Sequence, residues 1–293
     1  MTELFITPDD RLQKVFDTAA PGTVIHLSPG VYRQKAVIRT PGLTVIGSGA
    51  DKTRIVFHDY ARKRGEDGFE LITFRTYTLA VCADGVTLQD LAVCNDAGEP
   101  CKKGQQVALS VVADQFRMEN CRLSSTQDTL FCGPLPDDLI ERYEGFLPDP
   151  LRRGGHMEQV FSGCLIEGTV DFIFGCGCAL FDGCQIRSLS DGRDLGYIAA
   201  PAHEKRQTAG FHFRRCAMTD GGAGEQRVYL ARPWRDHGLC VFENCAYGGH
   251  IKTEGFHHWD NTQRWNTARF FETPAVTGRV PWVKPAGEDK AYE

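Results

Sequence analysis

The chain has 293 residues, of which 42% are hydrophobic and 24% are charged, as in an ordinary globular protein. Its formal net charge of −5, without any block of Lys and Arg, argues against a nucleic-acid partner. No apolar run is long enough to span a membrane. The opening MTELFITPDDRLQKVF lacks a basic stretch followed by an apolar one, so we expect a cytoplasmic protein, with secretion as the alternative if a leader has been removed.

Short segments rich in β-branched and aromatic residues recur along the chain, each bounded by Gly, Asp or Asn. In chain order these predicted strands are VIHL at 24–27, LTVIGSG at 43–49, VALSVV at 107–112, DFIFG at 171–175 and GFHF at 210–213. Few long stretches show the 3.6-residue periodicity of helices. The chain is therefore predicted to be all-β, with a single domain over residues 1–293.

Five of the twelve cysteines recur in one context, in which Phe and then two or more other, mostly polar or small, residues precede the Cys. These are Cys121, Cys164, Cys184, Cys216 and Cys245. Leu91 takes the same place in an earlier segment. Such spacings fit one repeat with loops of varying length, as in a parallel β-helix whose coils stack on one another. The cysteines would then be reduced thiols that form an inward-facing apolar ladder.

The repeat also predicts which residues face each other on neighbouring coils. Asp128 lies seven residues after Cys121, and Asp171 lies seven residues after Cys164. If the two cysteines stack, the two aspartates lie on adjacent strands, about 4.8 Å apart. Residues 132–155, rich in Pro, Gly and charge, would be a loop inserted between these coils.

Two carboxylates this close can supply both an acid and a base or nucleophile, because their repulsion raises the pKa of one of them. Arg232, in YLARPWRDHG, is a candidate cation that would select which aspartate stays charged. Gln105 and Gln127 carry amide groups that can stabilise an oxyanion. Taken singly, each of these residues is more often structural, so the prediction of a site depends on their convergence. The aromatic residues in the same region are Phe131, Phe174, Trp234 and Trp259.

Four motifs follow one another along the chain. They are GQQVALSV at 104–111, QDTLF at 127–131, GTVDFIFG at 168–175 and ARPW at 231–234. Together they resemble the motifs of the pectinesterase family, the pectin methylesterases of carbohydrate esterase family 8. Three residues depart from the family pattern, with Gln106 in place of Ala, Phe131 in place of Tyr and Ala231 in place of Gly. The resemblance extends to about residue 272.

The resemblance implies a single-stranded, right-handed parallel β-helix (a pectin-lyase-like solenoid) that removes methyl esters from galacturonate units of pectin or oligogalacturonides, with no metal or other cofactor. It implies that Asp171 is a nucleophile that forms an acyl-enzyme, and that Asp128 is the general acid and then the general base. Arg232 would hold Asp171 charged, and Gln105 and Gln127 would stabilise the oxyanion. The residues implied to line the sugar cleft are Phe131, Phe174, Trp234 and Trp259.

Four further expectations concern the periphery, the oligomeric state and one substrate contact. The insertion at 132–155 follows the predicted acid directly, so it would hang over the cleft and narrow the site toward oligosaccharides or a chain end. An irregular C-terminal tail is expected from about residue 273, and the protein is expected to be a monomer. Phe131 lacks the hydroxyl of the usual Tyr, so one substrate contact would be missing.

Other functions remain open at this point. An esterase acting on another pectic ester, acetyl first, would use the same residues. A pectate lyase would need an acidic Ca²⁺ site, and a polygalacturonase would need carboxylates around a glycosidic bond. A non-catalytic carbohydrate-binding β-helix would be marked by the loss of one of the five polar residues, and none is lost.

Overall fold

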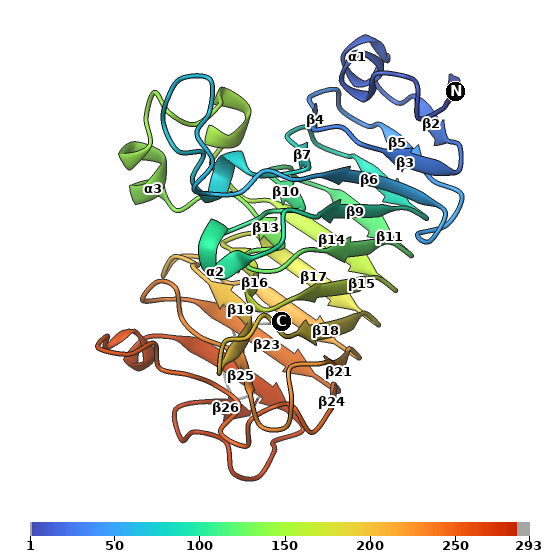
Figure 1. Cartoon of the computed structure of the whole chain (residues 1–293). Helices are drawn as coiled ribbons and strands as arrows, with labels where there is room; N and C mark the ends of the chain where they lie inside the picture. Colours follow the sequence, from blue (N-terminus) through green and yellow to red (C-terminus); the bar gives the residue numbers. More distant parts are fainter. Residues whose placement is uncertain (1, 286–293) are drawn as a thin grey trace.

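The computed structural model of the protein describes residues 2–285 and shows a parallel β-helix, with three sheets running along its length (Figure 1). Strands that neighbour one another within a sheet come from successive coils, and their pairings are parallel. The predicted fold class is therefore confirmed. No helix among residues 2–285 has the length and apolar character needed to cross a bilayer.

We name the sheets A, B and C. Sheet A has eleven strands: β1 (Glu3–Ile6), β2 (Val24–Leu27), β5 (Thr44–Ile46), β8 (Thr87–Gln89), β11 (Phe116–Glu119), β14 (Glu158–Ser162), β17 (Cys178–Asp182), β20 (Phe211–Arg214), β23 (Leu239–Glu243), β25 (Arg269–Thr273) and β26 (Lys284–Pro285). Sheet B has eight: β3 (Gly30–Tyr32), β6 (Thr53–Phe57), β9 (Ala92–Asn95), β12 (Arg122–Ser124), β15 (Leu165–Gly168), β18 (Gln185–Leu189), β21 (Ala217–Gly221) and β24 (Ala246–Tyr247). Sheet C has seven: β4 (Ala36–Ile38), β7 (Leu79–Val81), β10 (Leu109–Val111), β13 (Leu130–Cys132), β16 (Val170–Gly175), β19 (Gly196–Pro201) and β22 (Val228–Ala231).

Helices are short and lie outside the sheets. The α-helices are α1 (Leu12–Thr18), α2 (Pro100–Lys103) and α3 (Asp137–Arg142), and the 3-10 helices are η1 (Thr73–Arg75), η2 (Asp149–Arg152) and η3 (Arg264–Asn266). Helix α1 sits at the N-terminal end of the solenoid, where it buries Leu12 and Phe16 (Figure 1). It thereby helps to keep the first coil from exposing the apolar interior to water.

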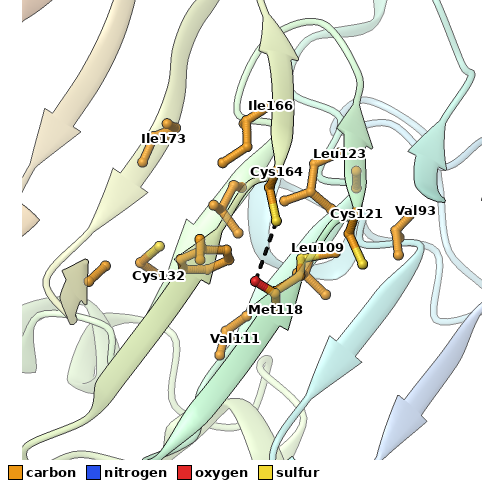
Figure 2. Close-up of a cluster of buried hydrophobic side chains, with 14 of the residues drawn as sticks. Val93, Leu109, Val111, Met118, Cys121, Leu123, Cys132, Cys164, Ile166 and Ile173 are labelled. Carbon is orange, nitrogen blue, oxygen red and sulfur yellow. Dashed lines mark hydrogen bonds between the residues drawn. The ribbon is translucent and has the colours of Figure 1, made fainter. Parts of the chain in front are cut away.

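A repeated turn between sheets A and B explains the context of the five cysteines. A residue with positive φ comes directly before each Cys, for example Asn120 at 52° and Gly163 at 61°. Asn and Gly adopt this conformation at little cost, which is why polar or small residues precede most of the cysteines. Each Cys thiol then donates to a backbone carbonyl of the preceding coil, as Cys164 Sγ does to the Met118 oxygen at 3.4 Å (Figure 2).

The cysteines stack in the predicted register. Strand β12 pairs with β15 so that Arg122 faces Leu165, which places Cys121 beside Cys164. The next pairings of sheet B continue the column through Cys184, Cys216 and Cys245. In the other direction Leu91 lies beside Cys121, also as expected. All twelve cysteines are free thiols.

The Phe residues of the same repeat form a second column inside the solenoid. The rings of Phe161, Phe181, Phe213 and Phe242 are stacked or nearly parallel, with successive centroids 4.9, 4.7 and 4.7 Å apart. All four side chains are fully buried. The repeat in the sequence therefore corresponds to one thiol and one aromatic ring per coil.

The expected insertion leaves the solenoid after β13 and returns at β14, carrying α3 and η2. Its apolar side chains Leu135, Leu139, Leu147 and Leu151 are buried in an apolar cluster on the outer side of sheet C. The expected C-terminal tail contains β26, which pairs with β25. The last residues of that tail, 286–293, lie outside the described part of the chain.

The aromatic column predicts a large cost for removing one ring. Phe213→Ala should lower the free energy of unfolding by about 3–5 kcal/mol, because the cavity would lie between two stacked rings and could not collapse. Urea unfolding followed by tryptophan fluorescence measures this change. The matched control is Phe5→Ala, which removes a 74% exposed ring that stacks on His26, and it should change stability by less than about 0.5 kcal/mol. Equal effects of the two substitutions would contradict the stacking account.

Candidate active site

Two aspartates lie side by side at the N-terminal ends of strands β13 and β16 of sheet C. Strand β13 pairs with β16 so that Leu130 faces Ile173, and the same register places Asp128 next to Asp171. Both residues have positive φ, 62° and 48°, a left-handed conformation that Asp adopts more readily than most other non-Gly residues. Both are buried, with 7% and 8% of their surface exposed. The adjacency predicted from the cysteine ladder is therefore present.

Arg232 binds one of these two carboxylates. Its Nε donates to Asp171 Oδ1 at 2.8 Å and its Nη2 donates to Asp171 Oδ2 at 2.6 Å. The guanidinium group lies between two aromatic rings, 3.7 Å from the centroid of Tyr197 and 4.0 Å from that of Trp259. A bidentate, ring-sandwiched guanidinium has little freedom to turn toward Asp128. The cation therefore pairs with Asp171.

Asp128 is in the opposite electrostatic situation. Burial raises the pKa of its carboxyl well above the usual range, and the adjacent charge of Asp171 raises this pKa further. Arg232 and Arg193 act in the other direction without cancelling the rise. One buried carboxylate is thus ion-paired, while its neighbour favours the protonated form. A nucleophile and a general acid need this difference in protonation.

The two predicted glutamines both face the aspartates. Gln105 and Gln127 line the same cavity as Asp128 and Asp171. The Oε1 atom of Gln127 accepts a hydrogen bond from Arg193 Nη1 at 2.9 Å, so its NH₂ group is the donor end, and this group interacts with the Asp128 carboxyl. This is the orientation that an oxyanion requires.

The sequence offers two adjacent glutamines, and the structure separates them. Gln106 is fully buried; its Nε2 donates to the Gly98 oxygen at 2.7 Å, and its Oε1 accepts from the Thr126 hydroxyl at 3.2 Å. Its amide is therefore used within the protein. Gln105 is the member of the pair that faces the cavity, as predicted.

One cavity of about 260 Å³ collects eight of the nine predicted site residues. They are Gln105, Gln127, Asp128, Asp171, Phe174, Arg232, Trp234 and Trp259. Phe131 does not line this cavity and is only 2% exposed. The ring of Phe74, centred 5.5 Å away, packs against it instead. The expected sugar contact of Phe131 is therefore corrected: Phe74, which lines the cavity, occupies that place.

Three residues of this region were not predicted from the sequence, namely Phe74, Arg193 and Tyr197. Tyr197 faces Val170 in the pairing of β16 with β19, so the aromatic at the start of GYIAAP was the available signal. Arg193 is held by a two-oxygen ion pair with Asp191 in a loop, which no periodic pattern marks. Phe74 comes from the coil of β7, far from the motifs.

Among residues 2–285, one group could bring three metal-ligand atoms within 4.8 Å of one another: His257, His258 and Asp260. The Nδ1 atom of His257 accepts the backbone N–H of Trp259 at 3.3 Å. This places the ring proton on Nε2, the nitrogen that faces the Asp260 carboxylate. That nitrogen is then a donor rather than a ligand, so the geometry is that of a hydrogen-bonded turn.

Comparison with known proteins finds a matching family model, related sequences and similar solved structures. A family model described as Pectinesterase matches residues 3–134 and 154–282. Pectinesterase 31 of Arabidopsis thaliana is 30% identical over 287 residues, which cover 92% of this chain and 80% of that protein. A pectin methylesterase from carrot superposes with a TM-score of 0.79 at 23% identity, covering 96% of this chain and 86% of that one. A pectin methylesterase in complex with a hexasaccharide superposes with a TM-score of 0.77 at 23% identity, covering 95% and 89%.

The residues that the family model leaves unmatched, between 134 and 154, fall within the inserted segment. All nine predicted site residues fall within the matched ranges. The protein thus belongs to the pectinesterase family, a family of carboxylic ester hydrolases.

Proposed function

We propose that the protein hydrolyses methyl esters of galacturonate units in pectin or oligogalacturonides, with Asp171 as the nucleophile. One observation carries the assignment of roles: of two adjacent buried aspartates, Arg232 binds only Asp171. Family membership supports the ester chemistry. The hexasaccharide bound to a relative of the same fold supports a carbohydrate substrate.

In the first step the Asp171 carboxylate attacks the carbonyl carbon of the methyl ester. The former carbonyl oxygen gains negative charge as the tetrahedral intermediate forms. The amide N–H groups of Gln105 and Gln127 would stabilise that charge, because both side chains face the cavity. Arg232 forms the ion pair with the nucleophile and fixes the direction of its lone pairs.

In the second step the intermediate collapses, and the bond between the carbonyl carbon and the methoxy oxygen breaks. Asp128 gives its proton to that oxygen, and methanol leaves. The resulting Asp128 carboxylate then takes a proton from water, which attacks the acyl-enzyme and releases the free galacturonic acid; this acid loses its proton to solvent. This restores the Asp171 carboxylate and the protonated Asp128, so one water is consumed for each methanol formed.

The aromatic residues around the pair suit a pyranose ring. Phe174 and Trp234 meet edge to face with centroids 5.9 Å apart, and the Trp259 ring lies over the Arg232 guanidinium with its centroid 4.0 Å away. Their ring faces offer apolar surface to sugar C–H groups and limit the access of water to the reacting atoms. Such surroundings strengthen the electrostatic interactions at the reacting centre.

The nucleophile assignment predicts loss of activity in Asp171→Asn, by about 10³-fold or more in kcat on methylated oligogalacturonides. Asp128→Asn should lose about 10²–10⁴-fold, because methanol then leaves without a general acid. The measurement is methanol release in calcium-free buffer. Asp182→Asn is the matched control, since Asp182 pairs with Arg214 and Arg215 on sheet A, and it should keep full activity.

Three results would overturn this assignment. Full activity in Asp171→Asn would remove the nucleophile from the mechanism. If the native protein releases acetate from acetylated galacturonan and no methanol, the substrate is the acetyl ester. Release of reducing ends that depends on Ca²⁺ would instead indicate a lyase.

The electrostatics of Asp128 predict the pH dependence. Acylation needs protonated Asp128, so kcat/KM should fall as the pH rises through its raised pKa. The positive charge of Arg193 lowers this pKa, so Arg193→Gln should move the high-pH limb of kcat/KM to higher pH. The same substitution frees Gln127, which should reduce the maximum of kcat/KM by about tenfold.

The control for this pH shift is Arg227→Gln, which removes an exposed guanidinium paired with Asp194, the residue that follows Arg193 in the chain. Its pH profile should match that of the native protein. A limb that moves to lower pH in Arg193→Gln, or one that moves equally in both variants, would contradict the role of Asp128 as the acid.

A further inference from the structure

A row of residues crosses the strands on the outer face of sheet C, and its last two members form the floor of the cavity. Strand pairing places Val37, Ala80, Ser110, Phe131, Phe174 and Ala200 opposite one another on successive strands. Only the last two of these residues line the cavity. Ala80, Ser110 and Phe131 are 0%, 3% and 2% exposed, so the row is covered from β13 toward the N-terminal coils.

Residues 59–76 supply much of this cover, and we call them the bar. At its inner end Phe74, in η1, lies 5.5 Å from the Phe131 ring and 6.4 Å from the Phe174 ring. Thr73 and Phe74 line the cavity on this side. The bar therefore ends the cavity directly beside the coil that carries Asp128.

The base of the bar is fixed to the solenoid. The buried Asn95 amide donates to the carbonyl oxygens of Asp59 at 2.8 Å, Thr76 at 3.1 Å and Val107 at 3.1 Å. Lys35 Nζ bonds the Asp59 carboxylate at 2.7 Å and the Arg75 carbonyl at 2.6 Å. Both ends of the segment are thus tied to the same coils, and buried polar networks of this kind rigidify what they join.

The bar also contacts both sides of the cavity. On one side the backbone N–H of Ala61 donates to the backbone carbonyl oxygen of Gln105 at 2.9 Å, next to α2. On the other side the insertion packs against it, with Arg75 4.3 Å from the Phe146 ring and Phe74 5.9 Å from the Tyr143 ring. Figure 1 shows the loop that leads into η1 lying beside the segment that carries α3.

The opposite end of the cavity lies where sheet C ends at β22. Trp234 and Trp259 line it there and are half-buried. The guanidinium groups of Arg235 and Arg264 lie 4.9 and 5.9 Å from these two rings. Aromatic surface flanked by cations suits further galacturonate units, which carry one carboxylate each when they are not esterified.

We infer that the bar and the insertion make the cavity blind at its N-terminal end, so that the protein de-esterifies the terminal galacturonate unit of a chain rather than internal units. This inference rests on the proposed function. A cavity of about 260 Å³ closed at one end has room for few sugar rings beside Asp171. The substrate class is therefore the ends of galacturonan chains, and short oligogalacturonides supply the most ends per ester.

The test compares fully methylated galacturonans of decreasing chain length at equal total ester concentration. Initial methanol release should rise in proportion to the concentration of chain ends. Mass spectrometry of end-labelled hexamers stopped at low conversion should locate the first lost ester on a terminal unit. Equal rates at all lengths, or first loss from internal units, would overturn the inference while leaving the proposed function intact.

A second arm opens the blind end. The backbone N–H of Leu71 already donates to the Lys63 oxygen at 2.8 Å, so residues 64–70 can be replaced by two glycines without separating these ends. Phe74→Ala is a milder variant that removes the ring with which the bar closes the cavity. In either variant the rate on long polymer relative to trimer should rise at least about fivefold, because internal units then gain access. Phe5→Ala is the control, at the remote N-terminal strand, and should leave the ratio unchanged.

An unchanged ratio in both opened variants would overturn the assignment of the blind end to the bar. No methanol from any substrate would remove the proposed function, and this inference with it. Methanol from internal units in the native protein removes the inference alone, so the two failures are distinguishable.

Discussion

Parallel pairing of successive coils in a fixed register is the constraint on which the site depends. Nothing local brings Asp128 to Asp171, since a whole coil and an inserted segment separate them. Their adjacency follows from the pairing of β13 with β16 and from the turn that sets each coil in line with the last. The free energy that holds two carboxylates together is thus supplied by backbone hydrogen bonds and by the buried thiol and ring columns.

The stacked geometry creates an asymmetry that neither aspartate has by itself. Identical side chains on identical backbone conformations would share their protons evenly if their surroundings matched. Arg232 breaks this equivalence, because its position between Tyr197 and Trp259 directs its guanidinium N–H groups to Asp171 alone. The cost of burying the first charge is offset by the ion pair, and the cost of burying a second is avoided by keeping Asp128 protonated.

The repetitive part of the molecule was predictable because repetition is a property of sequence. The Cys positions predicted the coil, its register and the aspartate pair, and the motifs pointed to Arg232 and the two glutamines. The surroundings of these residues were not predictable in the same way. Phe131 was expected to line the sugar cleft because it belongs to the QDTLF motif, yet it is covered by Phe74, which comes from a loop two coils away. Contacts between loops depend on the conformation of each loop, and the repeat pattern of the sequence does not indicate them.

The way the insertion joins the solenoid has a consequence for how such a protein diversifies. The chain leaves sheet C after Cys132 and re-enters sheet A at β14, in normal pairing with β11. A change in the length of the insertion leaves the rise from one coil to the next unaltered. Selection can therefore change the substrate range by replacing inserted segments, while the catalytic residues on the coils are inherited unchanged.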